Sequence, residues 1–345
     1  MACWSFSRTE TRKIMFILSS YGLAIAFTVI TMLCWGSWAN TQKLAAKNWR
    51  FELFYWDYVI GVVALALIFA FTLGSVGEGG RGFLADIQQA DMANIRSALL
   101  GGVVFNAANI LLVAAIALAG MSVAFPVGIG IALIMGVIVN YIAAPQGNAT
   151  LLFTGVGFVA AAILIDAIAY GKLGGAKKAS SKGIILSVIA GVLMASFYRF
   201  VAASMSTDFV TPEAGKLTGY TAVVFFAIGI FVSNFIFNTI FMKKPVEGEP
   251  VTYKQYFAGN FKTHLMGVLG GIIWCVGMSF SIIAAGKAGY AISYGLGQGA
   301  TLVAALWGVF IWKEFKGASK QVNGLLGLMF ACFVIGIGLI IVAGK

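Results

Sequence analysis

The chain has 345 residues, of which 60% are hydrophobic and only 10% are charged, against roughly 25% charged residues in soluble domains. So few charges could not cover the surface of a water-soluble fold of this size. The composition therefore excludes a soluble domain, a disordered chain and a nucleic-acid-binding protein. The net charge of +11 is spread mostly over loops. We expect an all-α integral membrane protein.

The residue types give little evidence for a metal site, for disulfide bonds or for catalysis. The four cysteines are scattered, and Cys34, Cys275 and Cys332 lie in apolar stretches, where a thiol behaves as a small hydrophobic group. The chain has one histidine and no cluster of Cys, His, Asp and Glu, whereas a protein metal site needs several such ligands. We therefore expect no bound metal, no cofactor and no enzymatic activity.

Ten segments are long and apolar enough to cross a bilayer, which requires about 20 mostly apolar residues. Lipid offers no partner to backbone polar groups, and the segments lack the alternation of a β-barrel, so each should be a helix. The expected spans are 21–45, 53–76, 98–118, 121–144, 151–170, 183–203, 218–242, 264–286, 288–311 and 323–342.

The two halves of the chain share a short pattern. The junction at 119–130 and the junction at 285–297 both begin with Ala-Gly, contain a central Ala and end in Gly-x-Gly. A chance match of small residues is the alternative. Because each half has an odd number of spans, two repeats would be inverted relative to each other, as in many secondary transporters. The predicted organisation is a first five-helix repeat at 1–170, a linker at 171–182 and a second repeat at 183–345.

The distribution of basic residues predicts the orientation. Most lysines and arginines fall in the loops near 43–50, 172–182, 243–262 and 313–320, and such loops usually face the cytoplasm. We expect both termini and Asn148 outside the cell membrane and the linker inside.

Polar and aromatic residues recur on single faces of several spans. Thr31, Trp35 and Trp38 share one face of the first span, and Tyr290, Tyr294, Gln298 and Thr301 share one face of the ninth. Such stripes suit a cavity for a small neutral solute, although packing between helices or, for Trp38 and Tyr290, an interfacial belt is the alternative. The candidate substrate-binding residues are Trp35, Trp38, Asn106, Asn109, Trp274, Tyr290, Tyr294 and Gln298.

Three ionisable residues lie within or beside spans, where charge is costly and usually functional. Asp57 begins the second span, Asp166 lies late in the fifth, and Arg199 lies late in the sixth. Each is a candidate for ion coupling. The alternative for the acids is a structural role, such as an ion pair between Lys43 and Asp57. Local unwinding at the glycine-rich stretch 295–299 is a further expectation.

Several motifs resemble the ureide permeases, a family of the drug/metabolite transporter superfamily. Gly101-Gly102-Val103-Val104, Asn109, Gly120-Met121-Ser122-Val123 and Asn140-Tyr141 are similar to its third and fourth helices. Ala288-Gly289-Tyr290-Ala291, Trp307-Gly308-Val309 and Lys313-Glu314-Phe315 are similar to its ninth helix and exit, and Tyr55-Trp56-Asp57-Tyr58 resembles its entry to helix two. The first loop also resembles that of the rhamnose–proton symporters. Plant ureide permeases carry a long central loop, whereas this chain has a short linker.

The resemblance implies the ten-helix drug/metabolite transporter fold and the import of a ureide or nucleobase, such as allantoin or uracil, by alternating access. We expect the solute to be coupled to a proton, with sodium as the alternative ion. A monosaccharide–cation symporter is the alternative function, and a non-transporting scaffold or a channel is the alternative class. The expected partners are a small-molecule solute and the lipid bilayer, in a monomer or homodimer.

Overall fold

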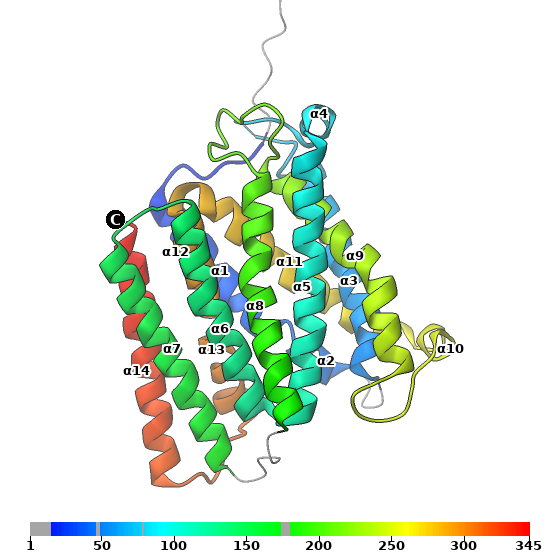
Figure 1. Cartoon of the computed structure of the whole chain (residues 1–345), viewed down its shortest axis with the longest axis vertical. Coiled ribbons are helices and arrows are strands. Elements are labelled where there is room, and N and C mark those ends of the chain that lie inside the picture. Colours follow the sequence, from blue (N-terminus) through cyan, green and yellow to red (C-terminus); the bar gives the residue numbers. More distant parts are fainter. Residues whose placement is uncertain (1–14, 46–48, 78, 174–179) are drawn as a thin grey trace, which may run out of the picture.

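The computed structural model describes residues 15–45, 49–77, 79–173 and 180–345. Over these ranges the chain forms a bundle of helices joined by short loops (Figure 1). The elements are α1 (Tyr21–Ser37), α2 (Asn40–Leu44), α3 (Phe51–Phe71), α4 (Phe83–Gln89), α5 (Met92–Ala119), α6 (Met121–Ala143), α7 (Ala149–Lys172), α8 (Ser181–Ser204), α9 (Gly219–Lys243), α10 (Tyr253–Phe257), α11 (Phe261–Ala288), α12 (Tyr290–Gly297), α13 (Ala300–Leu306), the π-helical turn η1 (Trp307–Ile311) and α14 (Lys320–Ala343).

The expected membrane helices are present. Within the described ranges, nine helices are long and apolar enough to cross a membrane, with α12, α13 and η1 acting together as one of them. The first expected span is divided, because α1 has 17 residues and α2 follows after a turn at Trp38 and Ala39. The all-helical membrane architecture is therefore confirmed, while the first helix is shorter than expected. Half of the predicted linker at 171–182, residues 174–179, lies outside the described residues.

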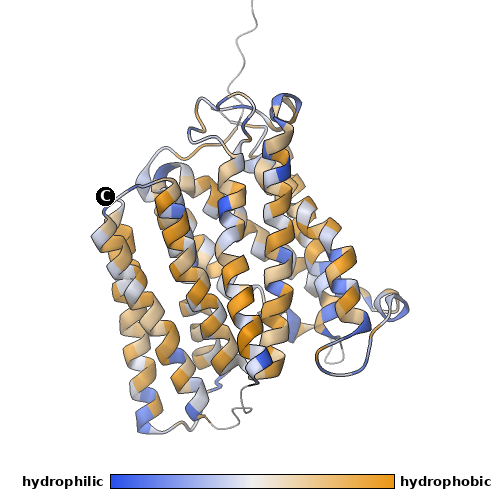
Figure 2. Cartoon of the chain, in the orientation of Figure 1, coloured by the Kyte–Doolittle hydropathy of each residue, from blue (hydrophilic) through white to orange (hydrophobic). Residues whose placement is uncertain are grey.

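The outer surface of the bundle is suited to lipid. Large aliphatic side chains such as Ile68, Ile142, Leu164 and Ile236 are between 53% and 71% exposed, which would be unfavourable in water. Figure 2 shows hydrophobic residues over most of the helices and hydrophilic residues gathered at the ends and loops. The surface thus repeats the division between spans and loops that the sequence predicts.

The loops lie at two opposite ends of the bundle. At one end, the amide of Asn148 donates to the carbonyl oxygen of Ala343 at 2.6 Å. At the same end, the amide of Met15 donates to the carbonyl oxygen of Gly79 at 2.7 Å. The C-terminus and the first described residues therefore lie at the same end (Figure 1). Helix α8 begins at the other end of the bundle (Figure 1).

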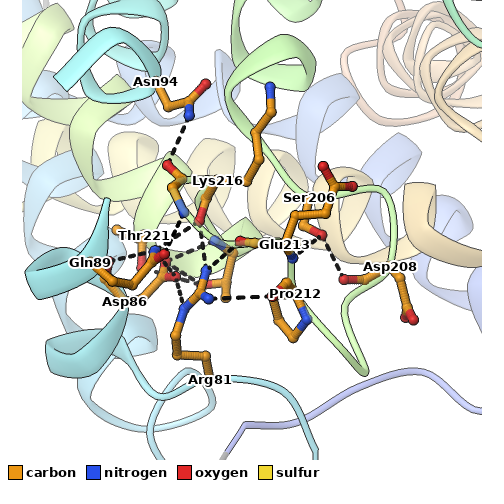
Figure 3. A network of polar contacts seen from close by, with 12 residues as sticks. Arg81, Asp86, Gln89, Asn94, Ser206, Asp208, Pro212, Glu213, Lys216 and Thr221 are labelled. Carbon is orange, nitrogen blue, oxygen red and sulfur yellow. Dashed lines mark hydrogen bonds and ion pairs between the residues drawn. The ribbon is translucent and has the colours of Figure 1, made fainter. Parts of the chain in front are cut away.

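A buried polar network ties together two loops at the end that carries Met15 and the C-terminus (Figure 3). The carboxylate of Asp86 is fully buried. It accepts hydrogen bonds from Arg81 Nε at 2.7 Å and from the amide and hydroxyl of Thr218 at 2.8 and 3.0 Å. Arg81 also donates to the carbonyl oxygens of Glu213 and Lys216. Because the buried charge is paired and hydrogen-bonded, it can be accommodated, and the loop that contains α4 is held against the loop before α9.

Glycines bring α5 and α9 into backbone contact. A Cβ atom at Gly102 of α5 would overlap the carbonyl oxygen of Phe226, and one at Gly229 of α9 would overlap that of Leu99. Small residues at such crossings are the usual means by which membrane helices approach closely. The two helices therefore touch at a point where any side chain would separate them.

The same arrangement joins α3 and α11. A Cβ atom at Gly271 of α11 would overlap the carbonyl oxygen of Tyr58, and one at Gly61 of α3 would overlap that of Val268. Two pairs of helices thus cross by the same device. Helix α5 also packs against α6 and α8, and α11 also packs against α1 and α12; we call α5 and α11 the central helices.

Single glycines also end both central helices. Gly120 has φ of 80° and Gly289 has φ of 84°, a region that favours glycine, and in each case the next helix begins at the following residue. The expected spans 98–118 and 121–144 are thus joined at a single glycine, as a tight helical hairpin. The ninth span is interrupted at Gln298 and Gly299, within the expected stretch. The carbonyl oxygen of Gln298 accepts from Thr301, so at this residue the interruption is a tightened turn rather than an open loop.

Candidate functional site

A cavity of about 150 Å³ lies between the central helices. It is bounded by α1, α5, α6, α8, α11 and α13. None of its lining residues is charged. The residues that line it are Trp35, Trp38, Phe105, Asn109, Leu112, Phe125, Ile129, Met194, Phe197, Trp274, Gln298, Ala300, Thr301 and Ala304.

Three aromatic rings form a continuous wall of this cavity. The rings of Trp35 and Trp274 are nearly parallel, with an interplanar angle of 14° and centroids 6.0 Å apart. Phe105 packs on Trp274 with centroids 4.5 Å apart. The indole Nε1 of Trp35 donates to the carbonyl oxygen of Trp274 at 3.2 Å, which fixes the orientation of its ring. The wall is therefore rigid and presents flat aromatic faces.

Three polar side chains complete the lining. Asn109 Nδ2 donates to the hydroxyl of Tyr55 at 3.1 Å, which leaves the amide oxygen of Asn109 available. Thr301 Oγ1 donates to the carbonyl oxygen of Gln298 at 2.9 Å, and this hydroxyl can still accept. The side-chain amide of Gln298 has no hydrogen bond to another residue in the described part of the chain. A few such groups in an otherwise apolar cavity are typical of sites that orient a small polar ligand.

The structure brings together five of the eight residues singled out as substrate-binding candidates. Trp35, Trp38, Asn109, Trp274 and Gln298 line the cavity. They come from α1, α5, α11 and the turn between α12 and α13, so residues far apart in the sequence meet at one place. Helical periodicity placed these residues on polar or aromatic faces and predicted a shared cavity, but it did not specify which helices pack together around it.

The other three candidates lie outside the cavity lining. Asn106 is fully buried and its amide bonds to Tyr55 at 2.9 Å and to Ser233 at 2.9 Å. Tyr294 donates to backbone carbonyl oxygens of α6 and α8, and Tyr290 to that of Ser206. In this conformation, these side chains join helices to each other and to a loop.

Most of the remaining lining is apolar. Phe105, Phe125, Met194 and Phe197 supply large parts of the wall. Nothing in the sequence distinguishes these residues from the many other apolar residues of the spans. Thr301 is different, because it lies on the polar face of the ninth span and could have been included on that ground.

Asp57 lies away from the cavity, at the end of the bundle that carries α2 and α10. Its Oδ1 accepts from the hydroxyl of Tyr256 at 2.7 Å and lies 2.8 Å from Nδ1 of His264. Burial and the hydrogen bond to Asp57 raise the pKa of Tyr256 above its ordinary value. Lys43, the expected partner of Asp57, instead pairs with Glu314 at 3.1 Å. Asp57 thus connects α3, α10 and α11, and its contact with the single histidine had no signal in the sequence.

The other two ionisable candidates lie on different helices and have different surroundings. Asp166 of α7 lines a second, smaller cavity of about 60 Å³ that adjoins the first. Arg199 of α8 is half-buried and lies close enough to Tyr290 for the two groups to interact electrostatically. The structure therefore brings one of the three ionisable candidates, Asp166, next to the central cavity.

Comparisons with known proteins agree with these features. A family model described as ureide permease matches residues 54–182 and 175–343. Ureide permease 1 of Arabidopsis thaliana is 22% identical over 94% of this chain and 98% of its own length. Probable ureide permease A3 of Vigna unguiculata is 22% identical over 88% of this chain and 99% of its own length. A solved crystal structure with 15% identity has a TM-score of 0.61 over 93% of this chain and 96% of its own, a likeness of fold alone.

The contacts of Asn106 predict a structural role that can be measured. The change Asn106→Leu leaves the hydroxyl of Tyr55 without its acceptor in a buried site, and we expect the free energy of unfolding to fall by about 1–2 kcal/mol. Asn140→Leu is the matched control, because Asn140 is also buried and its amide oxygen has no partner. Unfolding in detergent micelles compares the two, and equal stability of Asn106→Leu and the unmodified protein would contradict the prediction.

Proposed function

Because the chain belongs to the ureide permease family, we propose that it imports a small uncharged polar solute together with a proton, by alternating access. The observation that carries this proposal is the central cavity, which combines an aromatic wall with amide and hydroxyl groups and no charged lining residue. A neutral solute can enter such a site without leaving a charge unpaired. Ureides and nucleobases such as allantoin and uracil are the leading candidates.

The size of the cavity favours a solute with a single ring. An engineered protein cavity of about 150 Å³ holds one benzene molecule, and the cavity between the central helices has a similar volume. A flat heterocycle stacks on the wall formed by Trp35 and Trp274 and pairs its ring amide groups with Asn109 and Gln298. A monosaccharide stacks less completely and carries a hydroxyl group on most ring carbons, for which three polar side chains are too few. The sugar therefore remains the second candidate.

We also propose that 1–170 and 183–345 are inverted repeats joined by 171–182. The packing supports this, since α5 contacts α8 and α9 while α11 contacts α1 and α3, as expected if α1 corresponds to α8 and α3 to α9. Gly102 and Gly271 stand at the same distance from the start of their helices, and so do Gly61 and Gly229. Rocking of two such repeats about a central site is a common form of alternating access.

The transport proposal is tested with purified protein in liposomes. With an acidic outside and a neutral inside, we expect saturable accumulation of labelled allantoin or uracil, and no loss when choline replaces sodium at fixed pH. Unlabelled rhamnose or ribose should not compete. Flux that is not saturable and does not depend on the gradient would indicate a channel. Loss of uptake without sodium would refute the coupling of transport to a proton.

The proposed roles of the polar residues are tested by affinity. Gln298→Leu removes a hydrogen-bonding group and leaves a solute group unpaired, so we expect the affinity for allantoin or uracil to fall by about 5- to 150-fold, or about 1–3 kcal/mol. Gln42→Leu is the matched control, because Gln42 lies in α2 and does not line the cavity. Isothermal titration in detergent measures both, and an unchanged affinity of Gln298→Leu would remove this residue from the site.

The proposed orientation, with both termini outside, is tested by labelling in cells. In a protein without native cysteines, Lys345→Cys should react with a membrane-impermeant maleimide added outside, while Lys316→Cys should react only after permeabilisation. Both positions are exposed, so access depends on the side of the membrane. The reverse labelling pattern would invert the topology.

A further inference from the structure

The small cavity beside the solute cavity contains a carboxylate. It lies between α6, α7 and α13, and it shares Phe125, Thr301 and Ala304 with the lining of the larger cavity. Asp166 lines only the smaller one. The carboxylate of Asp166 therefore lies next to the solute cavity, with only these shared residues between them. Thr301 lines both cavities.

The carboxylate of Asp166 is incompletely satisfied. Its Oδ1 is buried and has no hydrogen-bond partner. A buried charge without a full set of partners is costly, and binding a proton removes that cost. The neutral acid then has an O–H group that can donate to Thr301 or to a solute group nearby. Protonation of Asp166 can thus be linked to occupancy of the solute cavity.

A chain of polar groups leads from Asp166 toward the end of the bundle expected to face the cytoplasm. Tyr170 is one turn along α7, on the same face as Asp166, and its hydroxyl donates to Glu314 Oε2 at 2.6 Å. Glu314 Oε1 lies 3.1 Å from Nζ of Lys43. A side chain at Gly308 would collide with both Tyr170 and Glu314. The glycine thus makes room for this pair of residues.

Glu314 differs from Asp166 in its access to water. Its side chain is 32% exposed and that of Lys43 is 50% exposed. Burial raises the pKa of Glu314, but the hydrogen bonds from Tyr170 and Lys43 and the charge of Lys43 together lower it below its ordinary value. Glu314 is therefore a carboxylate at neutral pH. It can receive a proton and pass it to water rather than hold it.

The groups that face Asp166 are few. Tyr170 lies on its own helix, and the charge of Glu314 acts on it from the loop after η1. Lys43 of α2 pairs with Glu314 rather than with Asp166. From α6 and α13 it faces Phe125, Pro126, Thr301, Ala304 and Ala305. Toward α14, Lys172 lies near Gln321, with 3.4 Å between their polar atoms.

We propose that Asp166 binds the coupling proton in this side cavity and that Glu314 receives it at the cytoplasmic end. This inference rests on the proposed function and specifies its coupling site. Asp166 takes one proton and becomes a neutral acid while the solute is loaded. After the change to the inward-facing state it loses that proton, which Glu314 accepts and passes to water, while Tyr170 keeps its own. In the described part of the chain, Asp57 also has an unpartnered oxygen, Oδ2, but it is not used, because it lines neither cavity and its Oδ1 holds α3 to α10 and α11.

The test compares two assays on the full-length protein in liposomes, with labelled allantoin and uracil as probes. One assay is accumulation driven by a proton gradient, and the other is exchange of solute at equal pH on both sides. For Asp166→Asn we expect accumulation to fall to the level of protein-free liposomes, while exchange continues and no longer varies with pH. Asp166→Glu should retain accumulation. Asp57→Asn is the control, and its two activities should fall together with the folded fraction.

Several outcomes would overturn the inference. Normal accumulation by Asp166→Asn would remove this residue from coupling and leave transport itself intact. Loss of both activities by a folded Asp166→Asn would assign it to solute binding instead. If Asp166→Asn does not fold, Asp166→Glu decides, because an unshifted pH dependence of accumulation would contradict the inference. Unmodified protein that exchanges solute but never accumulates it under a proton gradient would refute the proposed function itself.

Discussion

At the centre of the bundle, α5 and α11 each cross a neighbour at glycines where backbone meets backbone. These crossings determine how close the helices lie. Aromatic rings one turn further along α5 and α11 fill the space between the helices. Phe105 lies three residues after Gly102, and Trp274 lies three residues after Gly271. The two rings therefore meet in the middle of the protein, with their centroids 4.5 Å apart. The aromatic wall of the cavity is a consequence of the glycine contacts.

Hydrogen bonds then determine which polar groups remain free. Tyr55 donates to Asn106 and accepts from Asn109. Asn106 is therefore bonded within the helix packing, whereas the amide oxygen of Asn109, which lines the cavity, remains unbonded to any described residue. The indole N–H of Trp35 likewise donates a hydrogen bond to a backbone carbonyl oxygen of α11. Polar groups buried in a low-dielectric interior are strongly driven to find partners. The groups left over, on Asn109, Gln298 and Thr301, are the polar groups that line the central cavity.

The aspartates Asp57, Asp86 and Asp166 differ in their partners and in their place in the fold. Asp86 is paired with Arg81 and fixes two loops, and Asp57 is held by Tyr256 and His264 where α3, α10 and α11 meet. Within the described ranges, Asp57 and Asp166 each keep one buried carboxylate oxygen without a partner, but only Asp166 lies beside the central cavity. Protonation changes the cost of burying such a carboxylate. The position of Asp166 next to the cavity is therefore what distinguishes it from Asp57.

Composition and apolar periodicity were enough to determine that the chain is an all-helical membrane protein, because lipid leaves backbone groups no other way to be satisfied. They also determined the hairpin at Gly120 and placed Trp35 and Asn109 on polar faces. Periodicity assigns a residue to a face of its own helix but does not specify the helix against which that face packs. The tertiary structure decided that Asn106 is part of the packing, that Asp57 meets His264, and that Lys43 pairs with Glu314. These contacts join residues about fifty to three hundred positions apart, where no local spacing rule operates.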